Sequence, residues 1–185
     1  MSSSFQGIPK YIIGWIVVFV IRLIPFRAPN IEPVMATLMP FSKRYGMFGA
    51  FIFGSLSIAL FDLAVGKVGQ WTAITAIAYG AVGVGSGIYF RKRESNRKNY
   101  LIFAVFGTLF YDAVTGLSIG PLFFSQPFGE AFIGQISFTL WHLAGNILFA
   151  LIISPVLYQW VVTNRRFEFN KIIEILNSKT SSQNI

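Results

Sequence analysis

Residues 71–98 read WTAITAIAYGAVGVGSGIYFRKRESNRK, an apolar run from Trp71 to Phe90 followed directly by a dense basic cluster. About 20 apolar residues are enough for a helix to cross the hydrocarbon core of a bilayer, and Lys and Arg collect in the cytoplasmic connections between such helices. The same alternation recurs along the chain. Twelve of the fifteen Lys and Arg residues fall in four places: Lys10, Lys43-Arg44, Arg91 to Lys98, and the tail from Arg165 onward. The pattern indicates a protein that crosses a membrane several times.

The composition supports this assignment and excludes other classes. Of 185 residues, 54% are hydrophobic and 12% charged, and the mean hydropathy is +0.62. A soluble domain carries roughly twice that charged fraction. The net charge of +8 lies in short loops between apolar segments, which favours contact with membrane lipid and argues against nucleic acid. Cysteine is absent, which excludes disulfides, thiolate metal sites and cysteine nucleophiles.

Six apolar segments are predicted to form helices. The third, fourth and sixth are long enough to span a bilayer, the first and fifth span it with their flanks, and the second is short. No cleavage site follows the first segment, so it is expected to be a retained helix. We predict an all-α membrane protein, a compact bundle of six transmembrane helices in one domain (residues 1–185). The segments cover about residues 11–25, 31–41, 47–65, 71–90, 100–115 and 131–162.

The positive charges orient this bundle. Six crossings put both termini on one side, and a cytoplasmic placement puts all four basic clusters inside the cell. The outer connections are then about residues 26–30, 66–70 and 116–130, with Arg27 and Lys67 as their bases. A five-helix count would place the two strongest clusters on opposite faces. We therefore predict a multi-pass plasma-membrane protein with cytoplasmic termini and a cytoplasmic tail at 163–185.

Asp62 and Asp112 are candidate binding residues. Each is predicted to end a helix near the outer surface, on neighbouring segments. Acidic side chains within or beside a span usually face protein or a water-filled cavity, because lipid cannot solvate them. The two carboxylates are therefore candidates to contact a polar or cationic part of a ligand. The alternative is that they are interfacial acids, hydrated or paired with Arg22, Arg27 or Lys67.

The last apolar segment carries a polar stripe. Gln135, Thr139, His142 and Asn146 are spaced i, i+4, i+7 and i+11, which places all four on one helical face. In lipid such a face must turn toward the bundle interior or a cavity. It is either a binding wall of amide, hydroxyl and imidazole groups or the polar contact that holds this helix to its neighbours. A lone histidine is more often satisfied by a neighbour than by a metal, so we predict no metal and no cofactor.

Two predicted outer loops add further candidates. Three prolines between Arg22 and Pro33 stiffen the first loop, which brings Arg27 and Asn30 near Asp62. Arg27 is a candidate to bind an anion, and an internal ion pair is the alternative. In the fifth loop Phe124 and its apolar neighbours cannot remain in water. They are expected to form a lid that stacks on a planar substrate, or an interfacial segment.

The remaining motifs argue against nucleotide chemistry. The series Gly80, Gly83, Gly85 and Gly87 lies in an apolar segment without lysine, so it predicts close helix packing and not a phosphate loop. The metal-protease, serine-hydrolase and paired-carboxylate signatures are absent from the sequence. A weak echo between residues 53–66 and 106–116 suggests either an old duplication of helix pairs or two independent helix ends.

Several stretches resemble a family of transporter subunits. These are Arg22-Leu23-Ile24-Pro25-Phe26 with Pro29-Asn30-Ile31-Glu32-Pro33, Trp71-Thr72-Ala73-Ile74-Thr75, and Tyr111-Asp112 followed by Gly116. Together with the size and helix count they resemble the substrate-binding S components of energy-coupling factor (ECF) vitamin transporters. One departure concerns the first helix, which reads Gly14-Trp15-Ile16-Val17-Val18-Phe19 and lacks the small-residue repeat that often meets the coupling subunit. The Gly80–Gly87 surface is a substitute docking face on this hypothesis.

The resemblance implies a function and partners. An S component captures a vitamin-like molecule outside, and ATP-driven uptake then requires a membrane coupling subunit and two separate ATPase subunits. The implied substrate is a small, partly aromatic nutrient held by Asp62, Asp112, Trp71, Phe124 and the polar stripe, with Arg27 and Asn30. We predict no enzymatic activity. The alternatives are a scaffolding membrane protein without a ligand and, third, an intramembrane enzyme that uses Asp62, Asp112 and His142.

Overall fold

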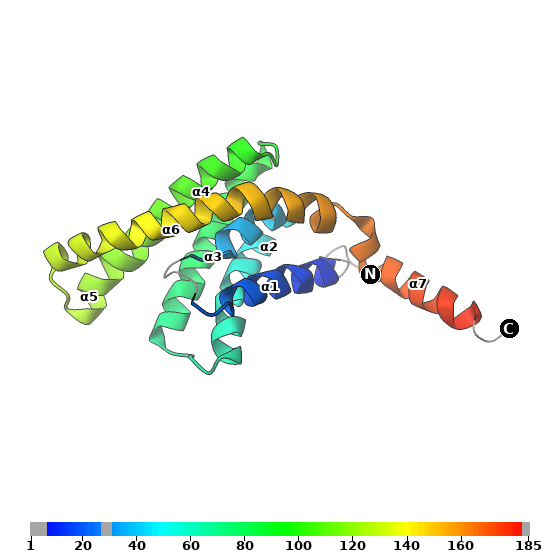
Figure 1. Cartoon of the computed structure of the whole chain (residues 1–185), viewed down its shortest axis with the longest axis horizontal. Coiled ribbons are helices and arrows are strands. Elements are labelled where there is room, and N and C mark those ends of the chain that lie inside the picture. Colours follow the sequence, from blue (N-terminus) through cyan, green and yellow to red (C-terminus); the bar gives the residue numbers. More distant parts are fainter. Residues whose placement is uncertain (1–6, 27–30, 183–185) are drawn as a thin grey trace.

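The computed structural model describes residues 7–26 and 31–182, and the regular elements in these ranges are helical (Figure 1). The α-helices are α1 (Ile8–Arg22), α2 (Val34–Ala64), α3 (Gln70–Arg91), α4 (Arg97–Asp112), α5 (Gly120–Phe124), α6 (Phe128–Leu157) and α7 (Phe169–Ser182). The π-helical segments η2 (Ala113–Ile119) and η3 (Tyr158–Val162) continue α4 and α6, and the 3₁₀ turn η4 (Arg165–Phe167) precedes α7. The predicted all-α class is confirmed.

Helix α2 folds back on itself at Gly46, which adopts φ 70° and ψ −166°. A residue with a side chain rarely adopts this positive φ, so glycine makes the reversal inexpensive. Twelve residues of straight helix would separate Phe41 from Phe53 by about 18 Å. Their ring centroids are instead 4.4 Å apart and the rings are stacked. The second and third predicted segments are therefore two antiparallel halves of α2.

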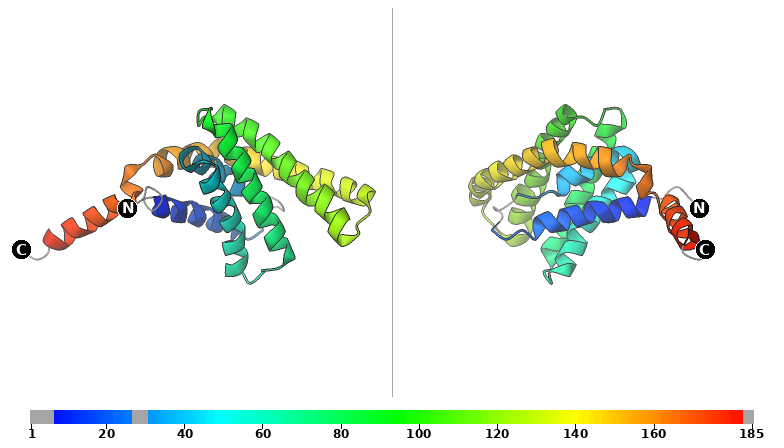
Figure 2. Two further views of the ribbon diagram at one scale, coloured as in Figure 1. Left: turned by 180° about the vertical axis from the view of Figure 1, so that it is seen from behind. Right: turned by 45° about the vertical axis from the view of Figure 1, so that its right-hand side comes forward.

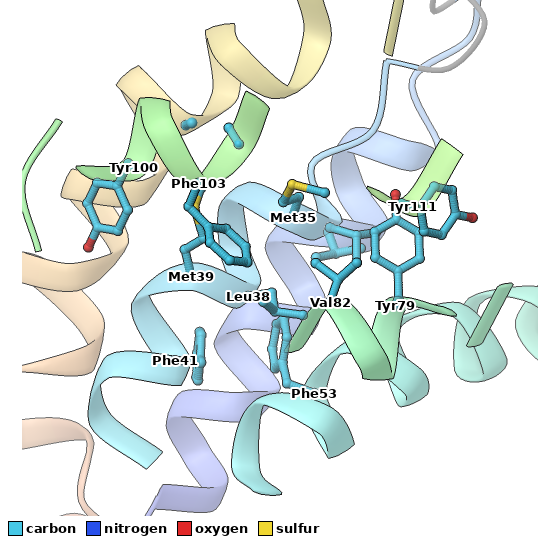
Figure 3. Close-up of a cluster of buried hydrophobic side chains, with 14 of the residues drawn as sticks. Met35, Leu38, Met39, Phe41, Phe53, Tyr79, Val82, Tyr100, Phe103 and Tyr111 are labelled. Atoms are coloured by element: carbon cyan, nitrogen blue, oxygen red, sulfur yellow. The ribbon is translucent and has the colours of Figure 1, made fainter. Parts of the chain in front are cut away.

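The first half of α2 is the centre of the molecule. All residues from Val34 to Ser42 are buried, whereas a membrane helix at the periphery exposes one side to lipid. Ser154 of α6 donates a hydrogen bond of 2.7 Å to the carbonyl oxygen of Ala36, so the last long helix closes over this segment. Figure 3 shows Met35, Leu38 and Met39 of this segment among aromatic side chains from α3 and α4.

The second half of α2 packs against α3 through glycines. A Cβ atom at Gly83 would lie 2.5 Å from the carbonyl oxygen of Ala50, and one at Gly87 would meet the backbone of Met47. The predicted close helix packing is therefore confirmed for Gly80, Gly83 and Gly87, and it is wrong for Gly85, beside which a Cβ atom would meet no other atom within 4 Å. The suggestion that the Gly80–Gly87 surface offers a docking face is wrong for Gly80, Gly83 and Gly87, because the chain's own α2 covers these positions.

The helical run that starts with α4 is longer than predicted. It continues through η2 and α5 to Phe124, so the predicted outer loop at 116–130 is reduced to a short connection before α6. Ser125 makes the turn in the left-handed conformation, with φ 53°. Because Asp112 lies inside this run, the prediction that it ends a helix is wrong. The predicted tail is also partly helical, since it contains η4 and α7.

Within the described ranges, four helical runs are long and apolar enough to cross a membrane. They cover Val34–Ala64, which reverses at Gly46, and the runs Gln70–Arg91, Arg97–Phe124 and Phe128–Val162. Helix α1, with 15 residues, is shorter than a typical span. The chain is thus a multi-pass membrane protein, with α6 lying across the bundle (Figure 1).

The predicted basic clusters meet at one end of the bundle. Lys10 Nζ donates 2.9 Å to the carbonyl oxygen of Val162 and lies 3.6 Å from Glu168, which is also 4.0 Å from Arg44. Lys43 donates to the carbonyl oxygens at the end of α3, those of Phe90 and Arg93. We call this the basic end of the bundle. The loop between α2 and α3 and the connection between α5 and α6 lie away from it (Figure 2).

Candidate functional site

Asp62 belongs to an ion-pair cluster at the end opposite the basic end. Its Oδ2 accepts a hydrogen bond of 2.7 Å from Thr72 Oγ1, and its Oδ1 lies 4.0 Å from Arg22 Nη2. The same Arg22 nitrogen is 3.4 Å from Glu32, and the guanidinium lies 4.0 Å above the ring of Phe61. Pairing with Arg22, one of the alternatives drawn from the sequence, is therefore observed. Thr72 also caps α3, because its hydroxyl accepts from the backbone N–H of Gly69.

Asp112 and His142 form a buried pair between α4 and α6. Their exposed side-chain fractions are 2% and 3%, and Nδ1 lies 2.7 Å from Oδ1. A carboxylate accepts hydrogen bonds, so Nδ1–H of the imidazole donates, which fixes the ring orientation. The remaining nitrogen, Nε2, is 3.5 Å from the hydroxyl of Tyr79 on α3. Asp112 Oδ2 has no hydrogen-bond partner among the described residues.

A second polar contact lies one helical turn deeper. Asn146 Nδ2 donates 2.8 Å to Thr108 Oγ1, and Thr108 donates 2.6 Å to the carbonyl oxygen of Ala104. Both side chains are fully buried. Asn146 therefore joins α6 to α4, and it lines none of the cavities in the described part of the chain. At this position the polar stripe serves helix contact.

Three aromatic rings surround the buried pair. Tyr111 and Phe138 meet the imidazole of His142 edge-on, with centroids 5.5 and 5.7 Å away. The ring centroids of Tyr79 and Tyr111 are 4.4 Å apart, and Figure 3 shows these two side chains together between α3 and α4. These rings are not among the binding residues predicted from the sequence. Their signal was only the position of Tyr111 beside Asp112.

Gln135, the first residue of the stripe, lines a cavity of about 200 Å³. Gln135 reaches into the space left by the missing side chain of Gly116 and donates 3.1 Å to Thr139 Oγ1. Trp71 also lines the cavity, and its ring stacks on that of Phe124 at 5.2 Å with an interplanar angle of 9°. The full lining is Trp71, Thr115, Gly116, Gly120, Gln126, Ala131, Gly134, Gln135 and Phe138.

The candidate residues thus fall into three groups. Trp71 and Gln135 line the cavity, and Phe124 and Thr139 lie beside it through their contacts with these two residues. Below it, Phe138 links the cavity to the Asp112–His142 pair, whereas Asp62 belongs to a separate cluster. Arg27 and Asn30 lie outside the described residues. Among the described residues, no three His, Asp or Glu side chains converge on a metal position.

Comparison with known families identifies the chain. A family model described as ECF-type riboflavin transporter, S component, matches residues 11–115, which is more than half of the sequence. The chain belongs to this family. The family predicted from the sequence is thereby confirmed. No curated protein and no solved structure matches the chain.

S components are substrate-binding subunits of transporters and not enzymes, so the predicted lack of enzymatic activity is confirmed and the intramembrane-enzyme alternative is set aside. They bind a small molecule and work with a membrane coupling subunit and ATPase subunits. In this S component the matched range includes Asp62, Trp71 and Asp112. It ends before the polar stripe of α6.

Proposed function

We propose that this S component captures a planar, partly aromatic nutrient, riboflavin or a heterocycle of similar shape, at the outer end of the bundle. The observation that carries the proposal is the cavity beside the stacked Trp71 and Phe124. An aromatic ring binds well against other aromatic faces, and the amides of Gln126 and Gln135 offer donors and acceptors for the edge of a heterocycle.

The proposed orientation follows from the basic end. In this proposal the two halves of α2 on either side of Gly46 count as separate passes, which with α1, α3, the α4–α5 run and α6 gives six. Positive charge favours the cytoplasmic side, so the basic end and both termini are cytoplasmic, and the cavity opens toward the outside. The lid proposal is retained for Phe124. Phe123 and Phe128, exposed at 74% and 60%, extend the apolar rim at this end.

The other candidate residues have different roles in this proposal. His142 and Asp112 lie behind Phe138 and line none of the cavities in the described part of the chain, so in this proposal a ligand donor reaches the unpartnered, buried Asp112 Oδ2 once Phe138 moves aside. Asp62 contributes through its ion pair with Arg22, which holds the start of the proline-rich loop containing Arg27 and Asn30. Substrate transfer to the cytoplasm requires the separate coupling subunit and two ATPases.

Ligand binding tests this proposal directly. The purified protein is analysed by mass spectrometry for copurified heterocycles, and then titrated with riboflavin, whose fluorescence is quenched by stacking on aromatic side chains. We expect the Trp71→Leu variant to lose at least about tenfold in affinity, the equivalent of roughly 1.4 kcal/mol. Trp160→Leu is the matched control, because Trp160 is 70% exposed on η3 at the basic end. Equal affinities of the two variants, or a protein that binds and retains no heterocycle, would contradict the proposed site.

A further inference from the structure

Helix α7 has two chemically distinct faces. With 100° between successive residues, Phe169, Ile172, Ile173 and Leu176 fall on one side of the helix, whereas Ile175 lies beside Lys171. Lys171, Glu174 and Ser178 fall on the other, where Lys171 Nζ forms an ion pair of 2.6 Å with Glu174. Such a separation is typical of a helix that lies at a boundary between water and an apolar phase.

The apolar face is not covered by the rest of the chain. The exposed fractions of Phe169, Ile173 and Leu176 are 36%, 41% and 58%. Figures 1 and 2 show α7 directed away from the bundle in each view. A large apolar face of this kind marks a surface that meets another apolar phase.

The position of α7 indicates that this apolar phase is the lipid bilayer. The membrane-spanning run of α6 and η3 ends at Val162, and α7 begins at Phe169 after the short turn η4. Glu168 directly precedes α7 and is bound to Lys10 and Arg44 at the basic end of the bundle. The start of α7 is therefore held where α6 leaves the membrane, within reach of lipid headgroups.

The charges near α7 match an anionic membrane surface. Arg165 and Arg166 lie in η4, and Lys171 lies on the polar face. Basic residues beside an anionic leaflet contribute attraction of about 1 kcal/mol each, and apolar side chains add burial at the headgroup boundary. We propose that α7 is an interfacial helix that lies on the anionic leaflet at the basic end, with Phe169, Ile172, Ile173 and Leu176 inserted below the headgroups. This inference is independent of the substrate, and the proposed topology identifies the leaflet as cytoplasmic.

The cysteine-free sequence allows a direct test. Ile173→Cys and Glu174→Cys place one environment-sensitive fluorophore on the apolar and on the polar side of α7, 100° apart, in the full-length protein. Each is reconstituted in vesicles of phosphatidylcholine with about one quarter phosphatidylglycerol, and in neutral vesicles of phosphatidylcholine alone. Spin-labelled lipid then quenches fluorophores within the bilayer, and iodide quenches those in water. Circular dichroism confirms that both variants keep the helix content of the parent.

We expect the extent of quenching by iodide to differ at least about threefold between positions 173 and 174, as an order of magnitude for a helix at the membrane boundary. The fluorophore at 173 should emit at shorter wavelength and respond to spin-labelled lipid, whereas that at 174 should respond to iodide. The contrast should weaken in neutral vesicles. Equal access of iodide to both positions overturns the proposal. The proposal is also overturned if position 173 is protected from iodide only when the coupling subunit or the ATPases are present. It is overturned as well if the protection increases with the density of this protein in the vesicle. In both cases a protein partner, and not lipid, covers the apolar face.

Discussion

Replacing His142 with leucine tests whether the buried pair holds α4 and α6 together. Leucine fills much of the imidazole volume, so the change removes the partner of Asp112 without leaving a large cavity. The 2.7 Å bond to Oδ1 is lost, and Oδ2 already has no partner among the described residues. The carboxylate, 2% exposed, is then buried without compensation.

The magnitude follows from this burial. An unpaired buried charge destabilises a soluble protein by about 3–5 kcal/mol. Hydrogen bonds between membrane helices contribute less, up to about 1.7 kcal/mol, because the unfolded chain in the membrane also finds partners. For a charged and nearly inaccessible acid we expect about 2–3 kcal/mol. At 2–4 °C per kcal/mol for a chain of this size, the Tm falls by about 4–12 °C.

The assay is thermal unfolding of the ligand-free protein in detergent, followed by tryptophan fluorescence or loss of monodispersity. Asp112→Asn preserves an acceptor for Nδ1–H and should destabilise the protein by about 1 kcal/mol. The double variant Asp112→Leu/His142→Leu removes both partners, so its loss should be at least about 1 kcal/mol smaller than the sum of the two single leucine variants. A His142→Leu protein that unfolds within about 1 °C of the parent, or leucine variants that add without coupling, would refute this account.

Two further predictions concern packing and the basic end. Gly83→Val should destabilise the protein by about 2–3 kcal/mol, because its Cβ meets a backbone carbonyl oxygen of α2 that cannot move aside. Gly85→Val is the control, since the space beside Gly85 is open, and equal losses of monodisperse protein in size-exclusion chromatography would contradict the packing. Lys10→Met removes the 2.9 Å bond to the carbonyl oxygen of Val162 and should lower stability by about 1–3 kcal/mol in the same unfolding assay. Lys171→Met, which affects only an exposed pair, should remain within about 0.5 kcal/mol of the parent, and a similar effect of both changes would exclude a structural role for Lys10.

Charge and hydropathy predicted much of this fold. The runs of apolar residues located the helices, and the prediction that Gly80, Gly83 and Gly87 form a packing surface is confirmed. The second and third segments were correctly separated near Gly46, although the sequence did not show that the first of them is wholly buried. The short length of this segment was the only indication of its complete burial. Burial on all sides depends on how the other segments assemble around it, which the sequence of the segment does not show.

The site was less accessible to sequence reasoning. The polar stripe of α6 was visible from its spacing, but the partner of each residue depends on the rotation of α4 about its axis. The prediction that Asp112 ends a helix depended on ending the fifth apolar segment at about residue 115, just before Gly116. In the structure Gly116 instead leaves room for the side chain of Gln135, and the helical run continues. Glycine in an apolar segment can either end a helix or leave room for a neighbouring side chain within a continuing helix, and residue spacing alone did not distinguish these two roles.

The wholly buried first half of α2 has a consequence for biosynthesis. This segment is synthesised second but becomes enclosed only when α6, made last among the long helices, contributes the hydrogen bond from Ser154. Until then its surface must be sheltered by α1, by the returning half of its own hairpin, or by the insertion machinery. A nascent chain that stops before α6 therefore exposes the future interior of the protein to lipid, and quality-control proteases have a clear feature by which to recognise it.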